Sequence, residues 1–162
     1  MGMSQTREIG AEKETYTVRP MVESDLTGVA RILVSSGICE DEDDVSRRVG
    51  LLLLEGNRLC FVAVADPGGP VLGVLLAIFN GFHVFLSHLA VHAEHRGLGV
   101  AQRLHEELLV HAVRLGAKGV VADSRLTTTG FFYRLGYRVP GVVFLVNRLE
   151  GTDGMSRTAH LP

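Results

Sequence analysis

The sequence predicts an α/β fold, and three observations support this prediction. Residues 84–115 run from an apolar, β-branched segment through a loop with two glycines into a long amphipathic pattern, which predicts a strand, a tight turn and a helix. Apolar runs at residues 71–79 and 82–91 flank Asn80-Gly81, a dipeptide typical of hairpin turns, so we expect these two strands to pair antiparallel. The chain is 46% hydrophobic and contains 19 glycines, which suits a compact α/β protein with many turns.

The first third of the chain predicts one strand and two helices. Residues 16–19 alternate as a short strand that stops at Pro20. Apolar residues recur at helical spacing within residues 23–36, and Gly37 ends that helix. The five acids at residues 40–44 precede a second helical pattern, because acidic side chains in a first turn complement the helix dipole.

The rest of the chain alternates strands and helices. Residues 59–65 predict a strand that ends at the turn sequence DPGGP, residues 66–70. Gly116 ends the long central helix that begins after Gly99. Beyond it, the patterns predict a strand at residues 119–122, a short helix at residues 127–135 and a final strand at residues 142–147.

Length and composition limit the classes of function. A chain of 162 residues can bury one core, and we expect a single domain at residues 15–150, with a flexible N-terminal lead at residues 1–14 and a flexible tail at residues 151–162. A net charge of −2 argues against a nucleic-acid partner, and the absence of long apolar runs argues against a membrane partner. Cys39 and Cys60 show no paired spacing, so free thiols and a cytoplasmic location are expected. Monomer and homodimer both fit the sequence.

The start of the central helix is a predicted anion site. The first turn of a helix has amide groups without intrahelical partners and a partial positive charge. Gly97 and Gly99 let the backbone come close to a ligand, and Arg96 and Arg103 add charge, so a phosphate or pyrophosphate is the expected guest. The alternative is an ordinary glycine turn between a strand and a helix.

Two sequence blocks resemble the GNAT superfamily of acyl-CoA-dependent N-acetyltransferases. HLAVHAEHRGLGVAQRL, residues 88–104, is similar to the central strand, pyrophosphate loop and helix of that family, with Arg96, Gly99 and Ala101 at the R/Q-x-x-G-x-G/A positions. GFFYRLGYR, residues 130–138, is similar to the closing FYxxLGF block. The resemblance implies a mixed, largely antiparallel central sheet flanked by helices on both faces. It also implies an N-acetyltransferase that moves an acetyl group from acetyl-CoA, its cosubstrate, to a primary amine.

The resemblance implies the residues of the site as well. The loop amides would hold the diphosphate, main-chain groups of the preceding strand would lie beside the pantetheine arm, and a tyrosine would protonate the leaving thiolate. The expected cofactor-binding residues are Leu89, Ala90, Val91, Arg96, Gly97, Leu98, Gly99, Val100, Ala101 and Gln102, and the expected catalytic residues are Tyr133, Ser87 and His88. The alternative for Tyr133 is packing in an aromatic cluster with Phe131 and Phe132.

The general base is less clearly marked than the other groups. Relatives carry a carboxylate or histidine near Ser87, but a serine alone is too weak a base. His88 has suitable chemistry near neutral pH, although regular strand alternation would place Phe85, Ser87 and Leu89 on one face and Leu86, His88 and Ala90 on the other. His83, beside the hairpin turn, is another candidate. The spacing of His88, His92 and His95 also suggests metal ligands, but these residues straddle a strand end and a loop, so no metal site is expected.

The acceptor is open between a small cationic amine, our first expectation, and a protein amine, our second. The acidic residues 40–44 would attract a cationic amine, whereas the alternative is a solvated helix start. Leu126 and Thr129 stand where relatives have Asn and Ala, and Ser124, Thr127 or Thr128 would then replace the Asn contact. This departure keeps open a catalytically weak acyl-CoA sensor. A Rossmann-type nucleotide binder would instead carry its glycine loop near the N-terminus.

Overall fold

The computed structural model describes residues 6–9, 14–54, 59–125 and 127–139. The chain divides into two compact units, Met1–Asp123 and Ser124–Pro162. The described part of the first unit contains a β-sheet and three α-helices, and that of the second contains one short α-helix.

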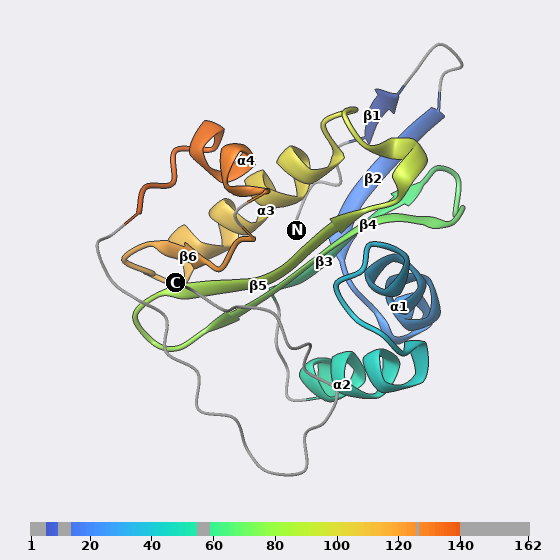
Figure 1. Ribbon diagram of the computed structural model, residues 1–162, viewed down its shortest axis with the longest axis horizontal. Helices are drawn as coiled ribbons and strands as arrows, with labels where there is room; N and C mark the ends of the chain where they lie inside the picture. The colour runs from blue at the N-terminus through green and yellow to red at the C-terminus, as the bar shows by residue number, and fades with distance from the viewer. Residues whose placement is uncertain (1–5, 10–13, 55–58, 126, 140–162) are drawn as a thin grey trace. The chain divides into compact units, whose positions relative to one another are not determined.

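The first unit is built on a six-stranded sheet with the strand order β1-β2-β3-β4-β5-β6 (Figure 1). Neighbouring strands pair antiparallel from β1 to β5, whereas β6 pairs parallel with β5. The predicted mixed, largely antiparallel sheet is therefore confirmed. The strands are β1 (Thr6–Ile9), β2 (Glu14–Pro20), β3 (Cys60–Ala65), β4 (Val71–Phe79), β5 (Val84–Val91) and β6 (Val120–Ala122).

The predicted hairpin joins β4 to β5. The Asn80 side-chain oxygen accepts hydrogen bonds from the backbone amides of Phe82 and His83 at 3.0 and 2.8 Å, so the Asn80 side chain closes the turn. Gly81 has a φ of +91°, which favours glycine. This tight antiparallel connection fixes the register in which β5 presents its residues.

Helices cover both faces of the sheet, as predicted (Figure 1). A methyl group at Gly73 of β4 would lie 3.0 Å from Val100 and 3.1 Å from Leu104, so glycine allows α3 to approach the sheet closely. Among the described helices, none is both long and apolar enough to cross a membrane. The helices of the first unit are α1 (Leu26–Ser35) and α2 (Glu42–Leu54) on one face and α3 (Val100–Arg114) on the other.

The core between the sheet and the α1–α2 pair identifies which strand residues face these two helices. The buried cluster draws on α1, α2 and alternate residues of β3, β4 and β5. Along each strand, the residues of this cluster alternate with residues that face α3, as expected for pleated strands. The cluster comprises Met21, Val29, Ala30, Ile32, Leu33, Val45, Val49, Cys60, Val62, Val64, Val74, Leu76 and Ala90.

The N-terminal end of the sheet extends beyond the predicted elements. Strand β1 lies within residues 1–14, where we expected a flexible lead, and it pairs with β2 from Thr6 opposite Thr17 to Ile9 opposite Glu14. Its sequence, TREI, carries no hydrophobic alternation, so its position in the sheet depends on pairing with β2. The predicted final strand at residues 142–147 and the tail at residues 151–162 lie outside the described residues.

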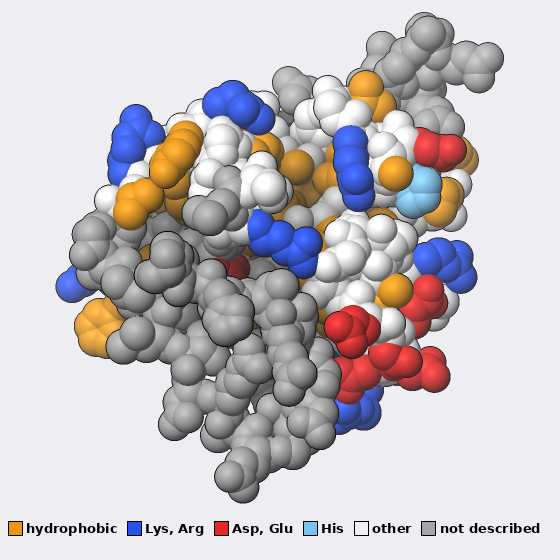
Figure 2. Space-filling model, viewed as in Figure 1, with side chains coloured by type: hydrophobic (Ala, Val, Ile, Leu, Met, Phe, Trp, Pro, Cys, Tyr) orange, Lys and Arg blue, Asp and Glu red, His pale blue; other side chains and the backbone are white. Residues whose placement is uncertain are grey.

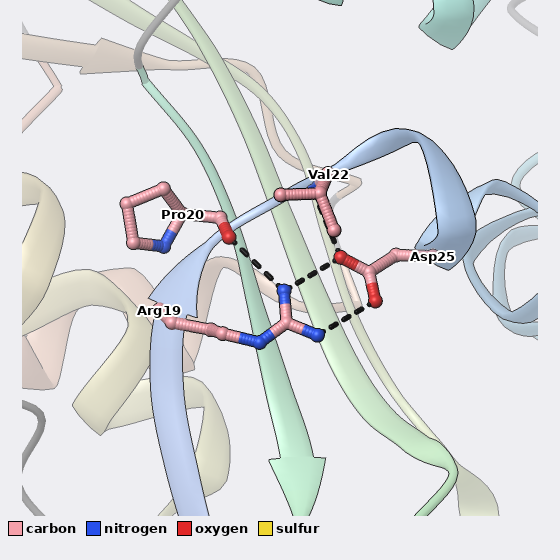
Figure 3. Close-up of polar contacts among 4 residues, drawn as sticks. All are labelled: Arg19, Pro20, Val22 and Asp25. Carbon is pink, nitrogen blue, oxygen red and sulfur yellow. Dashed lines mark hydrogen bonds and ion pairs between the residues drawn. The ribbon is translucent and has the colours of Figure 1, made fainter. Parts of the chain in front are cut away.

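An ion pair attaches the start of α1 to the end of β2 (Figure 3). Arg19 donates from Nη1 and Nη2 to the two carboxylate oxygens of Asp25 at 2.7 and 2.8 Å, and Asp25 also accepts from the Val22 amide at 2.8 Å. The Asp25 side chain is 7% exposed, whereas that of Arg19 is 35% exposed. Burial acts to raise the pKa of Asp25, but the bonds from Arg19 and Val22 and the charge of Arg19 together hold it below its usual value.

We expect Asp25→Asn to lower the free energy of unfolding by about 2 kcal/mol at pH 7, since it leaves the Arg19 guanidinium without its carboxylate. The folded pKa of Asp25 is depressed, so its stabilising contribution is complete above the unfolded pKa, about 3.9, and is lost as pH falls through the folded value. Urea unfolding of both proteins from pH 7 to pH 3 measures this. The difference between them should shrink toward pH 3, and a difference that stays constant would contradict the assignment.

Candidate active site and cofactor loop

The loop between β5 and α3 has the geometry of an anion-binding helix start. A short 3₁₀ turn, η2 (Ala93–His95), follows β5, and Gly97 and Gly99 then adopt φ values of +78° and +81° before α3 begins at Val100. A Cβ atom added at either glycine would meet nothing within 4 Å among the described residues. In this part of the chain, the space next to the two glycines is open to a ligand.

The amides of this loop are available for hydrogen bonding. Arg103 makes the first bond back from α3, donating its backbone N–H to Gly99 at 3.0 Å. Within the described residues, the backbone amides from residue 97 to residue 102 have no acceptor. This is the predicted row of donors, and it fits the negative charge of a diphosphate.

The two arginines predicted to add charge to the loop have partners in the protein. Arg96 donates from Nε to the Val91 carbonyl at 3.0 Å and from Nη2 to Ser36 Oγ at 3.3 Å, so it joins the end of β5 to the end of α1. The Arg103 side chain is 12% exposed and forms ion pairs with Glu106 and Glu107 of its own helix at 3.5 and 3.7 Å. Arg96 therefore shapes the loop, and the charge of Arg103 is balanced within α3.

Among the described strands, β5 has an open edge beside this loop. Its parallel ladder with β6 runs from Val84 opposite Val120 to Leu86 opposite Ala122, and the described ladder ends there. The last part of β5 therefore pairs with β4 on one side, while its other side faces the gap beyond the ladder.

The three main-chain positions predicted to lie along the pantetheine arm are not equivalent. The His92 amide donates to the Leu72 carbonyl at 2.8 Å, and bonded pairs recur at every second residue of an antiparallel ladder. Ala90 therefore directs its main-chain groups toward β4, while Leu89 and Val91 direct theirs toward the open edge. The Val91 carbonyl is bonded to Arg96, so among the described residues the Val91 amide and both main-chain groups of Leu89 are left for a ligand.

A β-bulge at Ser87 overturns the predicted alternation of β5. Leu76 of β4 lies opposite His88 and Ala77 lies opposite Leu86, so Ser87 is an extra residue without a partner in β4. Since Leu76 belongs to the core beneath α1 and α2, His88 points toward that face. The extra residue interrupts the pleat, and Ser87 and His88 become neighbours instead of facing opposite sides.

The two side chains are hydrogen-bonded. Ser87 Oγ donates to the Leu76 carbonyl at 3.1 Å, and His88 Nδ1 lies 3.0 Å from the same Oγ. When the single hydroxyl proton of Ser87 is directed to Leu76, the matching His88 tautomer carries its proton on Nδ1 and donates it to Ser87. This tautomer leaves the lone pair on Nε2 free to accept a proton.

Two acid–base groups affect each other here. Burial lowers the pKa of His88, and the nearby Asp123 carboxylate raises it, with a net lowering. Burial raises the pKa of Asp123, which the charge of His88 opposes. Asp123 directly follows β6 and was not among the predicted site residues. His83, the other histidine candidate, is exposed at the hairpin.

The remaining histidines of the loop are not arranged as a metal site. The rings of His92 and His95 meet edge to face, with centroids 5.6 Å apart. Across the described residues, no group of three or more His, Cys, Asp or Glu side chains is placed to hold a metal ion. The structure therefore offers no support for the spacing-based metal interpretation.

The second unit contains Tyr133 on α4 (Thr129–Arg134). The rings of Phe131 and Phe132 are 5.3 Å apart, and those of Phe132 and Tyr137 are 5.2 Å apart. Within the described residues it is thus Tyr137 that joins this aromatic cluster, and burial raises the pKa of Tyr137 to about 12. Tyr133 itself is 48% exposed.

The hydroxyl groups predicted to replace the family's Asn form a turn within this unit. Ser124 Oγ and Thr128 Oγ1 lie 3.0 Å apart, and both donate to the Arg125 carbonyl at 3.0 Å. Leu126, at the Asn position, lies outside the described residues, and Thr129 begins α4.

Two of the five acids at residues 40–44, around the start of α2, have structural roles. The Asp41 carboxylate accepts the Asp44 amide at 2.6 Å and caps the helix. Asp44 in turn pairs with Arg47 and Arg48. The side chains of the other three acids, Glu40, Glu42 and Asp43, are exposed, and Figure 2 shows acidic side chains gathered over α2.

A cavity of about 700 Å³ lies at the end of the sheet where β2 ends and β3 begins. None of the predicted site residues lines it. Its walls are mostly apolar: Pro20, Met21, Val22, Glu23, Leu26, Gly50, Leu53, Leu54, Cys60 and His111.

Known proteins share this fold. A sequence model of the acetyltransferase (GNAT) family matches residues 26–137, more than half of the chain. Ard1 from Thermoplasma volcanium is 19% identical with a TM-score of 0.68, covering 76% of this chain and 83% of that chain. Glucosamine-6-phosphate N-acetyltransferase from Arabidopsis thaliana is 16% identical with a TM-score of 0.66, covering 83% and 99%. The aminoglycoside N-acetyltransferase AAC(6')-Iy, in complex with CoA, is 19% identical with a TM-score of 0.65, covering 86% and 99%. The chain belongs to the GNAT family and is an acetyl-CoA-dependent N-acetyltransferase.

Proposed function

We propose that this enzyme acetylates a primary amine and that His88 Nε2 takes the proton from the amine. The observation that carries the proposal is the hydrogen-bonded Ser87–His88 pair at the β5 bulge, whose geometry suits the tautomer with a free Nε2. The lowered pKa of His88 keeps the imidazole neutral at pH 7, which is the form that a general base needs. The bulge lies directly before the open edge of β5, where main-chain donors are available.

Each proposed residue has a defined task. Bound acetyl-CoA supplies the acetyl group as a thioester. The amides of the segment from Gly97 to Gln102 bind its diphosphate, and Leu89 and Val91 orient the pantetheine arm through main-chain hydrogen bonds. A main-chain N–H at this edge would also stabilise the negative charge that develops on the acetyl carbonyl oxygen during the reaction. Tyr133 is the proposed proton donor to the leaving sulfur.

A small cationic amine is the acceptor that we propose first, and a protein amine is the second. Three exposed acids, Glu40, Glu42 and Asp43, lie in and before the first turn of α2 and would attract a cation. Thiol release can be measured across a panel of small polyamines, amino sugars and amino-terminal peptides at two salt concentrations. Preference for polyvalent cations that weakens with salt supports this choice, whereas equal rates for neutral peptides would contradict it.

The site of acetyl-CoA binding can be tested by calorimetric titration of Gly99→Trp. We expect its affinity for CoA and acetyl-CoA to fall more than tenfold, because an indole would occupy the open space over the loop. Gly116→Trp is the matched control, because Gly116 ends the same helix at a φ of +70° and imposes similar backbone strain away from the loop. Equal loss of affinity in both variants would indicate misfolding. Unchanged binding by Gly99→Trp would show that the cofactor does not bind at this loop.

A further inference from the structure

The end of the β5–β6 ladder brings a carboxylate to the same face of the sheet as His88. Leu86 and Ala122 are paired neighbours in this parallel ladder, so their side chains point to the same side. Leu86 lies opposite Ala77, whose neighbour Leu76 faces α1 and α2. Leu86 and Ala122 therefore face α3, and the same alternation carried one residue past β6 assigns Asp123 to the α1–α2 side.

His88 faces that side as well. It lies opposite Leu76, and the bulge at Ser87 shifts it onto this face just past the end of the ladder. Asp123 leaves β6 at the same level, past Ala122. The charge of Asp123 reaches His88, although the Asp123 side chain keeps contact with solvent.

The described elements packed around His88 bring few other groups that titrate. Cys39 and Cys60 both pack in the core on this face of the sheet. Burial raises the pKa of each thiol, that of Cys60 to about 11, so both are neutral at pH 7. Arg96, at the far end of β5, is bonded to Val91 and Ser36. Asp123 is the group that interacts with His88 through its charge, and each of the two shifts the pKa of the other.

We propose that Asp123 is a positioning residue for acetyl transfer, which stabilises the protonated imidazole of His88 through the gap between β5 and β6. In this arrangement Ser87 fixes the proton on Nδ1, and Asp123 favours the positive charge that forms when Nε2 accepts a proton from the acceptor amine. No covalent bond forms or breaks at Asp123. The proposal rests on the proposed function of His88 as the base.

The test is Asp123→Asn, measured first without substrate. Removal of the carboxylate should lower the His88 pKa by about half a pH unit in an NMR titration of the free protein, a modest shift because solvent screens the pair. Asp123→Glu should restore part of the shift. Asp66→Asn is the control, because Asp66 accepts from the Thr17 hydroxyl of β2, three strands away from β5, and should leave the His88 titration unchanged.

The pH profile of kcat/KM distinguishes positioning from a merely structural effect. The acid limb should move to lower pH by the same half unit, and kcat above it should fall about twofold, because a weaker base transfers the proton less well. A unique consequence is that Asp123→Asn loses less activity than wild type when the pH falls from 7 to 5.5. A structural defect would lower the rate at every pH and leave the limb in place.

The outcomes separate this proposal from the one on which it rests. An unchanged His88 pKa in Asp123→Asn would overturn the pairing whether or not His88 is the base. A shifted His88 pKa with an unchanged pH profile of the rate would show that the two groups interact but that Asp123 has no role in catalysis. A raised KM for the amine with no change in the His88 pKa would instead make Asp123 an acceptor contact.

Discussion

We expect His88→Gln to lower kcat about 100-fold or more at pH 7.5, while the affinity for acetyl-CoA in calorimetric titration stays within about twofold of wild type. General-base catalysis contributes about 10²- to 10⁴-fold to reactions of this type. Glutamine keeps a polar side chain that can still donate to Ser87, but it offers no basic nitrogen. Steady-state rates of thiol release with a saturating amine measure the effect.

The same variant should lose the acid limb of the kcat/KM profile. The His88 pKa is lowered by burial, so wild-type activity should be independent of this group above pH 6.5 and fall as pH drops through the lowered value. His83→Gln is the matched control, since His83 is the other histidine candidate and is exposed at the hairpin. Full activity in His88→Gln with a large loss of activity in His83→Gln would indicate that His83, at the hairpin, is the base.

The order of elements from β2 to α4 was predictable because each has a local signal. The hairpin follows from Asn80-Gly81, and α3 follows from the glycines before it and apolar residues at helical spacing. Strand β1 could not be predicted in this way, since TREI is polar and its place depends on pairing with β2. The mixed character of the sheet came from the resemblance rather than from periodicity, and the parallel pairing of β5 with β6 was not predicted.

The candidate site shows the same division between local and nonlocal information. The loop amides were predicted because a strand, two glycines and a helix are adjacent in the sequence. The bulge at Ser87 was missed because it depends on the register of β5 against β4, and the sequence from Phe85 to His88 is compatible with regular alternation. Asp123 was missed because its relation to His88 requires the parallel pairing of two strands separated by α3.

The roles of charged residues were also set by tertiary structure. Arg96 has the right spacing for the family motif, yet its guanidinium bonds to Val91 and Ser36. Arg103 pairs with carboxylates one turn along α3. Phosphate binding at this loop is therefore expected to depend mainly on backbone amides, which substitutions of side chains alter only through the shape of the loop.

We expect Tyr133→Phe to lower kcat about 100-fold, with KM for acetyl-CoA changed less than threefold, because the variant keeps the ring and removes only the proton donor. Tyr133 is about half exposed and lies outside the aromatic cluster that Phe131, Phe132 and Tyr137 form within the described residues. Stopped-flow single-turnover rates of acetyl transfer measure the chemical step and exclude an effect on product release.

Tyr137→Phe is the matched control for the loss of a phenol from the same unit. Tyr137 is half-buried and its ring packs against Phe132, so removal of its hydroxyl should change the thermal unfolding temperature rather than the single-turnover rate. Wild-type single-turnover rates in Tyr133→Phe would exclude this phenol as the acid. A loss of equal size in both variants would point to disruption of the second unit, because a proton donor and a packed ring cannot affect one chemical step alike.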